Sequence, residues 1–268
     1  MNSTEIVSRP DGSTIACINS GDPKLPSILL SNSLATTWEL WDKLLPSLEE
    51  NFNVIRYDTR GHGKSKTTMT NSTLEDLSDD AVAVLDHFSV HKAVFAGVSL
   101  GGMTGMTTAI RHTNRLHSLI ACNCRSSIDT AGIAAWEDRV AMSKPTGMQA
   151  LVEPTASRWF SKEYKSDHPL EMEQVGQMIT ATSIEGFEAC IRAIQGMQLS
   201  NQISKITLPT TFVAGSNDGA APPEVMQTMS QTVLNSKCEI LSPCGHLSPI
   251  EQPQALLDIL LRMRPGHS

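Results

Sequence analysis

Short apolar runs alternate along this 268-residue chain with longer segments of helical period, and this alternation limits the fold more than any other feature. Several of the apolar runs have almost no polar residue, which is typical of strands covered on both faces. The runs that read as strands are Thr14–Asn19, Ile28–Ser31, Val54–Asp58, Ala93–Gly97, Leu119–Cys122, Thr211–Ala214 and Cys238–Leu241. The alternation therefore predicts an α/β fold, with a mostly parallel central sheet flanked by helices.

Helices are predicted between these strands. In Thr73–Phe88, apolar residues recur at three- and four-residue spacing, as on one face of an amphipathic helix. Gly102–Arg111 and Gln254–Met263 also read as helices, and we expect the second to cover the sheet. The region 126–205 breaks the alternation, because it has helical spacing and no run that reads as a core strand. We predict a helical cap over 126–205, inserted into a core of residues 1–125 and 206–268.

The sharpest local motif is Gly97-Val98-Ser99-Leu100-Gly101, which follows an apolar strand and precedes a helical segment. A G-x-S-x-G turn between strand and helix forces the serine into a strained, exposed conformation, and its glycines avoid collisions with neighbouring backbone. We expect Ser99 to be a nucleophile. The alternative is a glycine-rich connection in which the serine has no chemical role.

A nucleophilic serine needs a base, and the base needs an acid that orients it. In a fold of this kind the chain order is serine, acid, histidine. Asp218 follows the strand Thr211–Ala214, and His246 follows the strand Cys238–Leu241. Carboxyl ends of parallel strands meet at one edge of a sheet, so Ser99, Asp218 and His246 are predicted to form a catalytic triad.

The oxyanion hole requires two backbone amides, one after the nucleophile and one after an earlier strand. We expect them to be those of Leu100 and Leu34. His62 precedes the serine in a glycine-rich turn, and we interpret it as structural. We expect Asp58 and Arg60 from the same segment to tie together loops near the site.

These residues resemble the α/β-hydrolase superfamily, and within it the 3-oxoadipate enol-lactonases. The segments that carry the resemblance are LLSNSLATTWELWD, IRYDTRGHGKS, FAGVSLGGM, FVAGSNDGAAPPE and CGHLSPIEQP. The resemblance implies that Ser99, Asp218 and His246 match the family's triad, that Leu34 and Leu100 match its oxyanion amides, and that Trp136 matches a tryptophan of the cap that lines the substrate pocket.

One departure from the family concerns the charge of the substrate. Where the cap begins, the family has a basic residue that faces the substrate carboxylate, and this chain has Ser127 there. Arg125 lies two residues earlier, and we expect it to point elsewhere. This favours a neutral ester or lactone. The alternative is that Arg125 or Arg139 reaches into the pocket and supplies the missing charge.

Composition excludes several other classes of function. The net charge of −7 and the lack of a basic cluster argue against nucleic acid as a partner. No apolar run is long enough for a membrane span, and the polar N-terminus lacks the apolar core of a secretory signal. The six cysteines are too scattered for a disulfide framework or a zinc site. We expect a soluble, cytoplasmic protein without metal or cofactor.

The sequence thus predicts a serine hydrolase that opens a lactone or small carboxylic ester through an acyl-enzyme. Fold alone does not determine the reaction. The same triad also serves C–C bond cleavage, acyl transfer or a biosynthetic ring closure, and a non-catalytic ligand receptor is a third alternative. The oligomeric state is left open.

Overall fold

The computed structural model describes residues 3–266, and within them eight strands form one sheet in the order β1-β2-β4-β3-β5-β6-β7-β8. Both neighbours of β2 run antiparallel to it, and every other neighbouring pair is parallel. The strands are β1 (Glu5–Ser8), β2 (Thr14–Ser20), β3 (Ser27–Ser31), β4 (Asn53–Tyr57), β5 (Ala93–Val98), β6 (Leu116–Cys122), β7 (Thr210–Gly215) and β8 (Ser236–Leu241).

All the strands predicted from apolar runs are present, with ends that differ by a few residues. The one missed is β1, an edge strand whose residues are mostly exposed. A strand that pairs on one side only and buries little surface leaves no apolar run in the sequence. β4 and β5 are buried along their whole length, as expected for strands covered on both faces.

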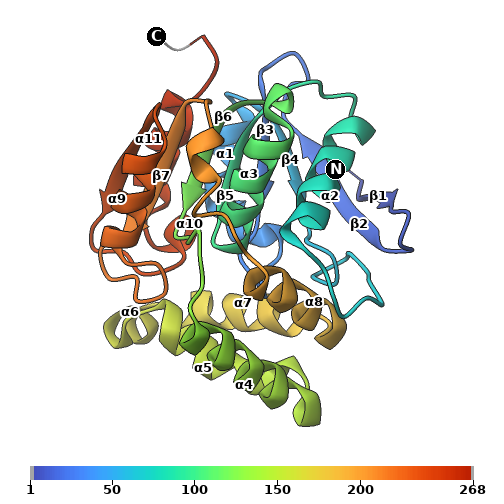
Figure 1. The fold of residues 1–268 in the computed structure, drawn as a ribbon, viewed down its shortest axis with the longest axis vertical. Helices are drawn as coiled ribbons and strands as arrows, with labels where there is room; N and C mark the ends of the chain where they lie inside the picture. Colours follow the sequence, from blue (N-terminus) through green and yellow to red (C-terminus); the bar gives the residue numbers. More distant parts are fainter. Residues whose placement is uncertain (1–2, 267–268) are drawn as a thin grey trace.

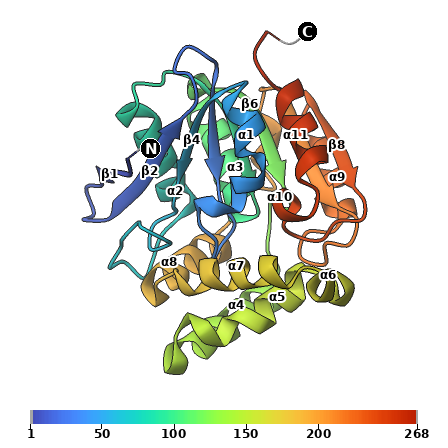
Figure 2. The same ribbon diagram turned by 180° about the vertical axis from the view of Figure 1, so that it is seen from behind.

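Helices cover both faces of the sheet, with α2 and α3 on one side and α1 and α11 on the other (Figures 1 and 2). Thr73 begins α2 through a capping box, in which it and Asp76 each accept the other's backbone amide. The helices outside the cap are η1 (Trp38–Leu44), α1 (Leu45–Glu49), α2 (Leu74–His87), α3 (Leu100–Arg111), η2 (Thr113–Arg115), η4 (Ile203–Lys205), α9 (Pro223–Thr232), α10 (Ser248–Glu251) and α11 (Pro253–Arg262).

The remaining helices lie together beyond the carboxyl ends of the parallel strands (Figure 1). They are α4 (Thr130–Thr146), η3 (Met148–Leu151), α5 (Val152–Trp159), α6 (Lys162–Asp167), α7 (Pro169–Thr180) and α8 (Ile184–Gln195). We call this group, which connects β6 to β7, the cap. Where the chain enters and leaves the cap, the Leu199 amide donates to the Ser126 carbonyl at 3.1 Å and the Ser200 hydroxyl donates to it at 3.2 Å.

The cap meets the core in a close backbone contact between Gly61 and Gly186. A Cβ atom on either glycine would collide with the Cα atom of the other. The Ser183 amide donates to the Gly61 carbonyl at 2.7 Å, and the Ser183 hydroxyl accepts from the Gly186 amide at 3.0 Å as α8 begins. The start of α8 is therefore held directly on the loop that follows β4.

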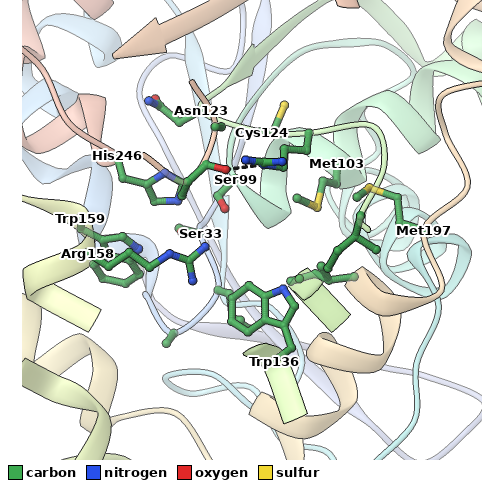
Figure 3. Close-up of a pocket in the computed structure, with 18 of the residues that line it drawn as sticks. Ser33, Ser99, Met103, Asn123, Cys124, Trp136, Arg158, Trp159, Met197 and His246 are labelled. Carbon is green, nitrogen blue, oxygen red and sulfur yellow. Dashed lines mark hydrogen bonds between the residues drawn. The ribbon is translucent and has the colours of Figure 1, made fainter. Parts of the chain in front are cut away.

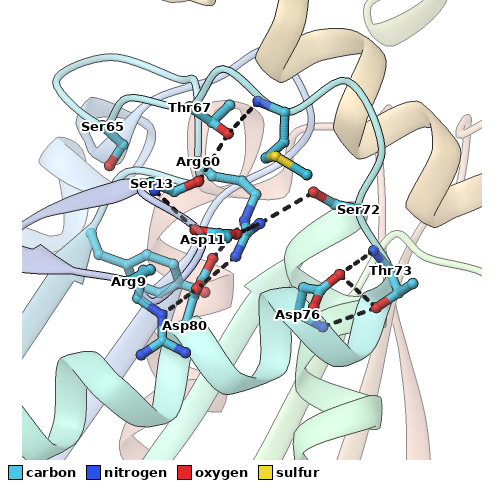
Figure 4. A network of polar contacts seen from close by, with 12 residues as sticks. Arg9, Asp11, Ser13, Arg60, Ser65, Thr67, Ser72, Thr73, Asp76 and Asp80 are labelled. Carbon is cyan, nitrogen blue, oxygen red and sulfur yellow. Dashed lines mark hydrogen bonds and ion pairs between the residues drawn. The ribbon is translucent and has the colours of Figure 1, made fainter.

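A buried network of charges joins the first hairpin, the loop after β4 and α2 (Figure 4). Arg60 donates to both carboxylate oxygens of Asp80, at 2.8 and 2.9 Å, and to Asp11 at 2.9 Å. Arg9 donates to Asp80 at 2.8 Å. The Asp58 carboxylate instead accepts hydrogen bonds from two backbone amides, that of Lys64 in the same loop and that of Trp38 in η1. Both Asp58 and Arg60 thus tie loops together, as the sequence indicated, but neither lines the cavity described next.

Candidate active site

Ser99 occupies the sharp turn between β5 and α3 with φ 54° and ψ −110°, a backbone conformation that is strained for any residue other than glycine. Its amide donates to the Cys122 carbonyl at the end of β6, at 2.8 Å. A Cβ atom on Gly97 would collide with Gly101, and one on Gly101 would collide with the Ser31 carbonyl. The two glycines let the turn close this tightly, and the turn presents Ser99 at the carboxyl edge of the sheet.

His246 and Asp218 form a buried pair in which His246 Nδ1 lies 2.9 Å from Asp218 Oδ2. The other carboxylate oxygen, Oδ1, accepts from the amides of Ala220 and Ala221 at 2.8 and 3.1 Å. Burial raises the pKa of Asp218, but the nearby His246 and the hydrogen bonds from His246, Ala221 and Asn123 outweigh it and lower the pKa to about 2. Asp218 is therefore a carboxylate at neutral pH.

The cap helps to hold His246. Its backbone amide donates to the Trp159 carbonyl at the end of α5, at 3.0 Å. The two rings stack, with centroids 6.1 Å apart and planes 20° from parallel. Two residues far apart in the sequence thus fix His246: Asp218 from the core and Trp159 from the cap.

Ser99 and His246 line one cavity of about 230 Å³ between core and cap (Figure 3). Of the residues predicted for the site, Leu34, Arg125, Ser127 and Trp136 line it as well. Asp218 lies behind His246, and Leu100 is buried under the turn at the start of α3. A space of this size accommodates a small molecule.

The two amides predicted for the oxyanion hole have no hydrogen-bond acceptor among the described residues. Within residues 3–266, neither the Leu34 amide nor the Leu100 amide donates a hydrogen bond. The loop that carries Leu34 turns through Ala35, with φ 59°. The Ala35 amide donates to Nε2 of His62 at 3.0 Å, and burial lowers the pKa of His62 to about 4. His62 is therefore a neutral structural residue, as the sequence indicated.

Three arginines line the cavity, where the sequence suggested that a cation was missing: Arg125, Arg139 and Arg158. Arg125 donates through Nε to the Ala220 carbonyl, so it does not point away from the site as we expected. The guanidinium carbons of Arg139 and Arg158 lie 4.8 and 5.1 Å from the ring centroid of Trp136. Ser127 lines the cavity as predicted, and Arg125 and Arg139 also reach it, which is the alternative that the sequence left open.

Arg139 and Arg158 make no ion pair with any acid in the described part of the chain. Burial lowers the pKa of Arg158 to about 10, and the positive charge of Arg139 adds to this. Burial also lowers the pKa of Arg139. Both remain charged at neutral pH, so the cavity is locally positive in a protein with a net charge of −7.

Sequence reasoning missed Arg158, Trp159 and Asn123 as residues of this cavity. Arg158 and Trp159 stand in the SRWFS segment of α5, which has no pattern that tells which side faces the core. Asn123 follows β6 directly, and its position after a central strand is the signal that could have identified it.

Within residues 3–266, no group of three or more His, Cys, Asp or Glu residues has the geometry to hold a metal ion. No helix in the same range has the length and apolarity needed to cross a membrane.

Comparisons with known proteins agree with this fold. The family model described as "alpha/beta hydrolase fold" matches residues 26–168. Two proteins of Acinetobacter baylyi are similar: 3-oxoadipate enol-lactonase 2, 31% identical over 88% of this chain and 87% of its own, and 3-oxoadipate enol-lactonase 1, 30% identical over 95% and 94%. The crystal structure of the enol-lactonase from Burkholderia xenovorans superposes with a TM-score of 0.92 at 28% identity, covering 97% of this chain and 99% of the other. The chain belongs to the α/β-hydrolase fold family.

Proposed function

We propose that this protein opens a lactone or a small carboxylic ester by acyl transfer to Ser99, with Asp218 and His246 completing a catalytic triad. One observation carries the proposal: a serine in a strained strand-to-helix turn lines the same cavity as a buried histidine that is bonded to an ionised aspartate. The relatives named enol-lactonases support the same reaction class.

In this reaction Ser99 Oγ attacks the carbonyl carbon while His246 accepts the serine proton. The acyl C–O bond then breaks, and the same proton passes to the leaving oxygen. Water activated by His246 next attacks the acyl-enzyme, and the carboxylic acid and free Ser99 are released. The amides of Leu34 and Leu100 stabilise the oxyanion of both tetrahedral intermediates.

We further propose that the substrate carries a carboxylate. Arg139 and Arg158 are partly buried, lie against Trp136 and have no acid partner within residues 3–266. A buried charge without a partner is costly, and an anionic substrate would satisfy both arginines when it binds. Figure 3 shows Arg158 extending into the space beside Ser99 and Trp136. An enol-lactone with a carboxylate side chain, as in the related enol-lactonases, is the proposed substrate class.

The nucleophile is tested by labelling with a fluorophosphonate and by hydrolysis of p-nitrophenyl esters and small lactones. We expect one label on the native protein and none on Ser99→Ala, because only an activated serine reacts. Ser127→Ala removes another serine of the same cavity and should keep both label and activity.

Ser99→Ala and His246→Ala should each nearly abolish turnover, and the double variant should be little worse than either. A Ser99→Ala protein with a tenth or more of the native kcat would refute the acyl-enzyme.

The charge of the substrate is tested with a matched pair of lactones, one with a free carboxylate and one with its methyl ester. A charge-assisted hydrogen bond contributes about 1.5–3 kcal/mol, so we expect kcat/KM to favour the acid by about tenfold or more. Arg158→Gln and Arg139→Gln should lower kcat/KM for the acid and leave the ester unchanged. Arg192→Gln removes an arginine of the cap that pairs with Glu137 and Glu188 and does not line the cavity, and it serves as the control. Equal rates for acid and ester would contradict an anionic substrate.

A further inference from the structure

Asn123 is fully buried beside the triad, and both polar atoms of its side chain form hydrogen bonds. Nδ2 donates to Asp218 Oδ2 and to the Gly245 carbonyl, each at 3.1 Å, and Oδ1 accepts from the Ser248 hydroxyl at 2.9 Å. This orientation of the amide is the one that fits, because a flipped amide would turn its oxygen toward a carboxylate and a carbonyl. The Ser248 hydroxyl donates to the oxygen on the other side of the amide and helps to hold it in this orientation.

The backbone at Asn123 connects the segments that carry the triad. The preceding carbonyl, that of Cys122, accepts from the Ser99 amide at 2.8 Å. The Asn123 amide donates to the Val213 carbonyl of β7, also at 2.8 Å, and β7 leads into the turn of Asp218. Asn123 has φ 51°, a left-handed conformation that asparagine tolerates better than most residues. This turn aims the side chain between Asp218 and the residue before His246.

Asn123 donates to the same carboxylate oxygen that faces His246 Nδ1. With Ala220 and Ala221 on the other oxygen, every side of the Asp218 carboxylate is occupied and it cannot rotate. A second donor on Oδ2 also withdraws negative potential from the imidazole. Its loss would leave Asp218 freer to turn and would stabilise the protonated imidazole.

We infer that Asn123, held by Ser248, is a positioning residue for the Asp218–His246 pair: it fixes the carboxylate in the orientation in which Oδ2 faces His246 Nδ1. The inference rests on the proposed role of this pair in ester or lactone opening. Asn123 does not accept or donate a proton in the reaction.

Other titratable groups around the pair are Arg158 from α5, Glu251 from α10, and the Cys124 and Cys244 thiols. Burial raises the pKa of both thiols, so they stay neutral, and Arg158 stays charged. Burial raises the pKa of Glu251 to about 7, with Asp218 and Glu171 adding to it, so Glu251 titrates within the working range. Glu251 accepts from the Gly245 amide, so its titration is linked to this cluster, and the NMR titration of the His246 ring is needed to separate the two groups.

The test compares the native protein with Asn123→Gly, which permits the left-handed backbone, and with Ser248→Ala, which removes the hydroxyl that donates to Asn123 Oδ1. The control is Ser118→Ala, another buried serine with one hydrogen bond, to the Met263 carbonyl at 3.2 Å. We measure kcat and KM for a p-nitrophenyl ester from pH 5 to 9, the melting temperature, and the titration of the His246 ring by NMR.

We expect Asn123→Gly to lower kcat about tenfold or more, with little change in KM, and to move the acidic limb of kcat/KM upward by about half a pH unit or more. Ser248→Ala should change kcat and the position of the acidic limb in the same directions but by less. Ser118→Ala should change neither kcat nor the limb. Folded Ser248→Ala with native kcat and an unmoved limb would overturn the inference, whether or not Asn123→Gly folds. If the native protein hydrolyses no ester or lactone, the proposed function fails instead, and the His246 titration still decides whether Asn123 acts on the pair.

Discussion

At the scale of single residues, His62 does not line the cavity but holds the loop that carries Leu34. Nε2 of His62 accepts from the Ala35 amide, so the neutral ring carries its proton on Nδ1 and donates it to the Arg60 carbonyl at 3.0 Å. Protonation of Nε2 would break the bond to Ala35. The loop that presents the Leu34 amide therefore depends on a histidine that stays neutral.

This dependence predicts a loss of stability in mild acid. The pKa of His62 falls from about 6.5 in the unfolded chain to about 4 when folded, so the unfolded state binds a proton first as the pH drops. The folded state should lose up to about 3 kcal/mol between pH 6.5 and 4 through this group, with no further loss below that range. His62→Gln offers an oxygen near the Nε2 position and does not titrate. The free energy of unfolding in urea, measured at pH 7 and pH 5, should fall less in His62→Gln than in the native protein. An equal fall in both would contradict this.

The residues proposed for the triad and the oxyanion hole could be predicted because short local patterns specify them. A serine between two glycines after a strand needs only its own neighbours to adopt the turn seen at Ser99. Arg158 could not be predicted in this way. Its place in the cavity depends on how α5 is oriented over the sheet, which is determined by contacts with distant residues.

At the scale of elements, the contact between Gly61 and Gly186 fixes where α8 sits on the core. Phe187 and Ile194 of α8 line the cavity, so a shift of this helix changes the pocket. The sequence predicted helices in the cap from their spacing. It did not indicate this contact, because two glycines 125 positions apart show no pattern that links them.

Gly186→Ala should therefore disturb both stability and substrate binding. The new methyl group would collide with backbone, which has less freedom to move than a side chain, and overpacking of this kind costs about 1–3 kcal/mol. We expect a lower melting temperature and a higher KM.

Gly196→Ala is the control for this prediction, because it makes the same change just beyond the other end of α8. The nearest atom to its new Cβ would be the Arg192 carbonyl oxygen at 3.4 Å, an ordinary contact. It should leave both the melting temperature and KM near their native values. Equal effects of the two substitutions would show that the glycine contact has no special role.

At the scale of the whole molecule, the buried charges of Arg60 and Asp80 join segments from the N-terminal half of the chain. Both side chains are at most 3% exposed. The attraction between such charges does little more than offset their lost hydration, but removing one partner leaves the other buried and unpaired. The network thus makes the correct assembly of these segments a requirement for stability.

Asp80→Asn should accordingly lower the free energy of unfolding by about 3–5 kcal/mol. The neighbouring Asp79 pairs with Arg111 and His112 at the surface, with its side chain 41% exposed. Asp79→Asn should cost less than about 1 kcal/mol. Denaturation in urea at pH 7 measures both, and similar losses in the two variants would show that burial of the network does not matter.

The hydrogen bonds from Leu199 and Ser200 to the Ser126 carbonyl bring the first and last residues of the cap segment together. A segment whose two ends meet can be lengthened, shortened or exchanged without pulling β6 and β7 apart. Selectivity and chemistry can then change independently, because the residues proposed for the triad stand on the core, and Arg139 and Arg158, which we propose bind the substrate, stand on the exchangeable part. A chimera that joins another relative's cap at these residues would give this core a new choice of substrate.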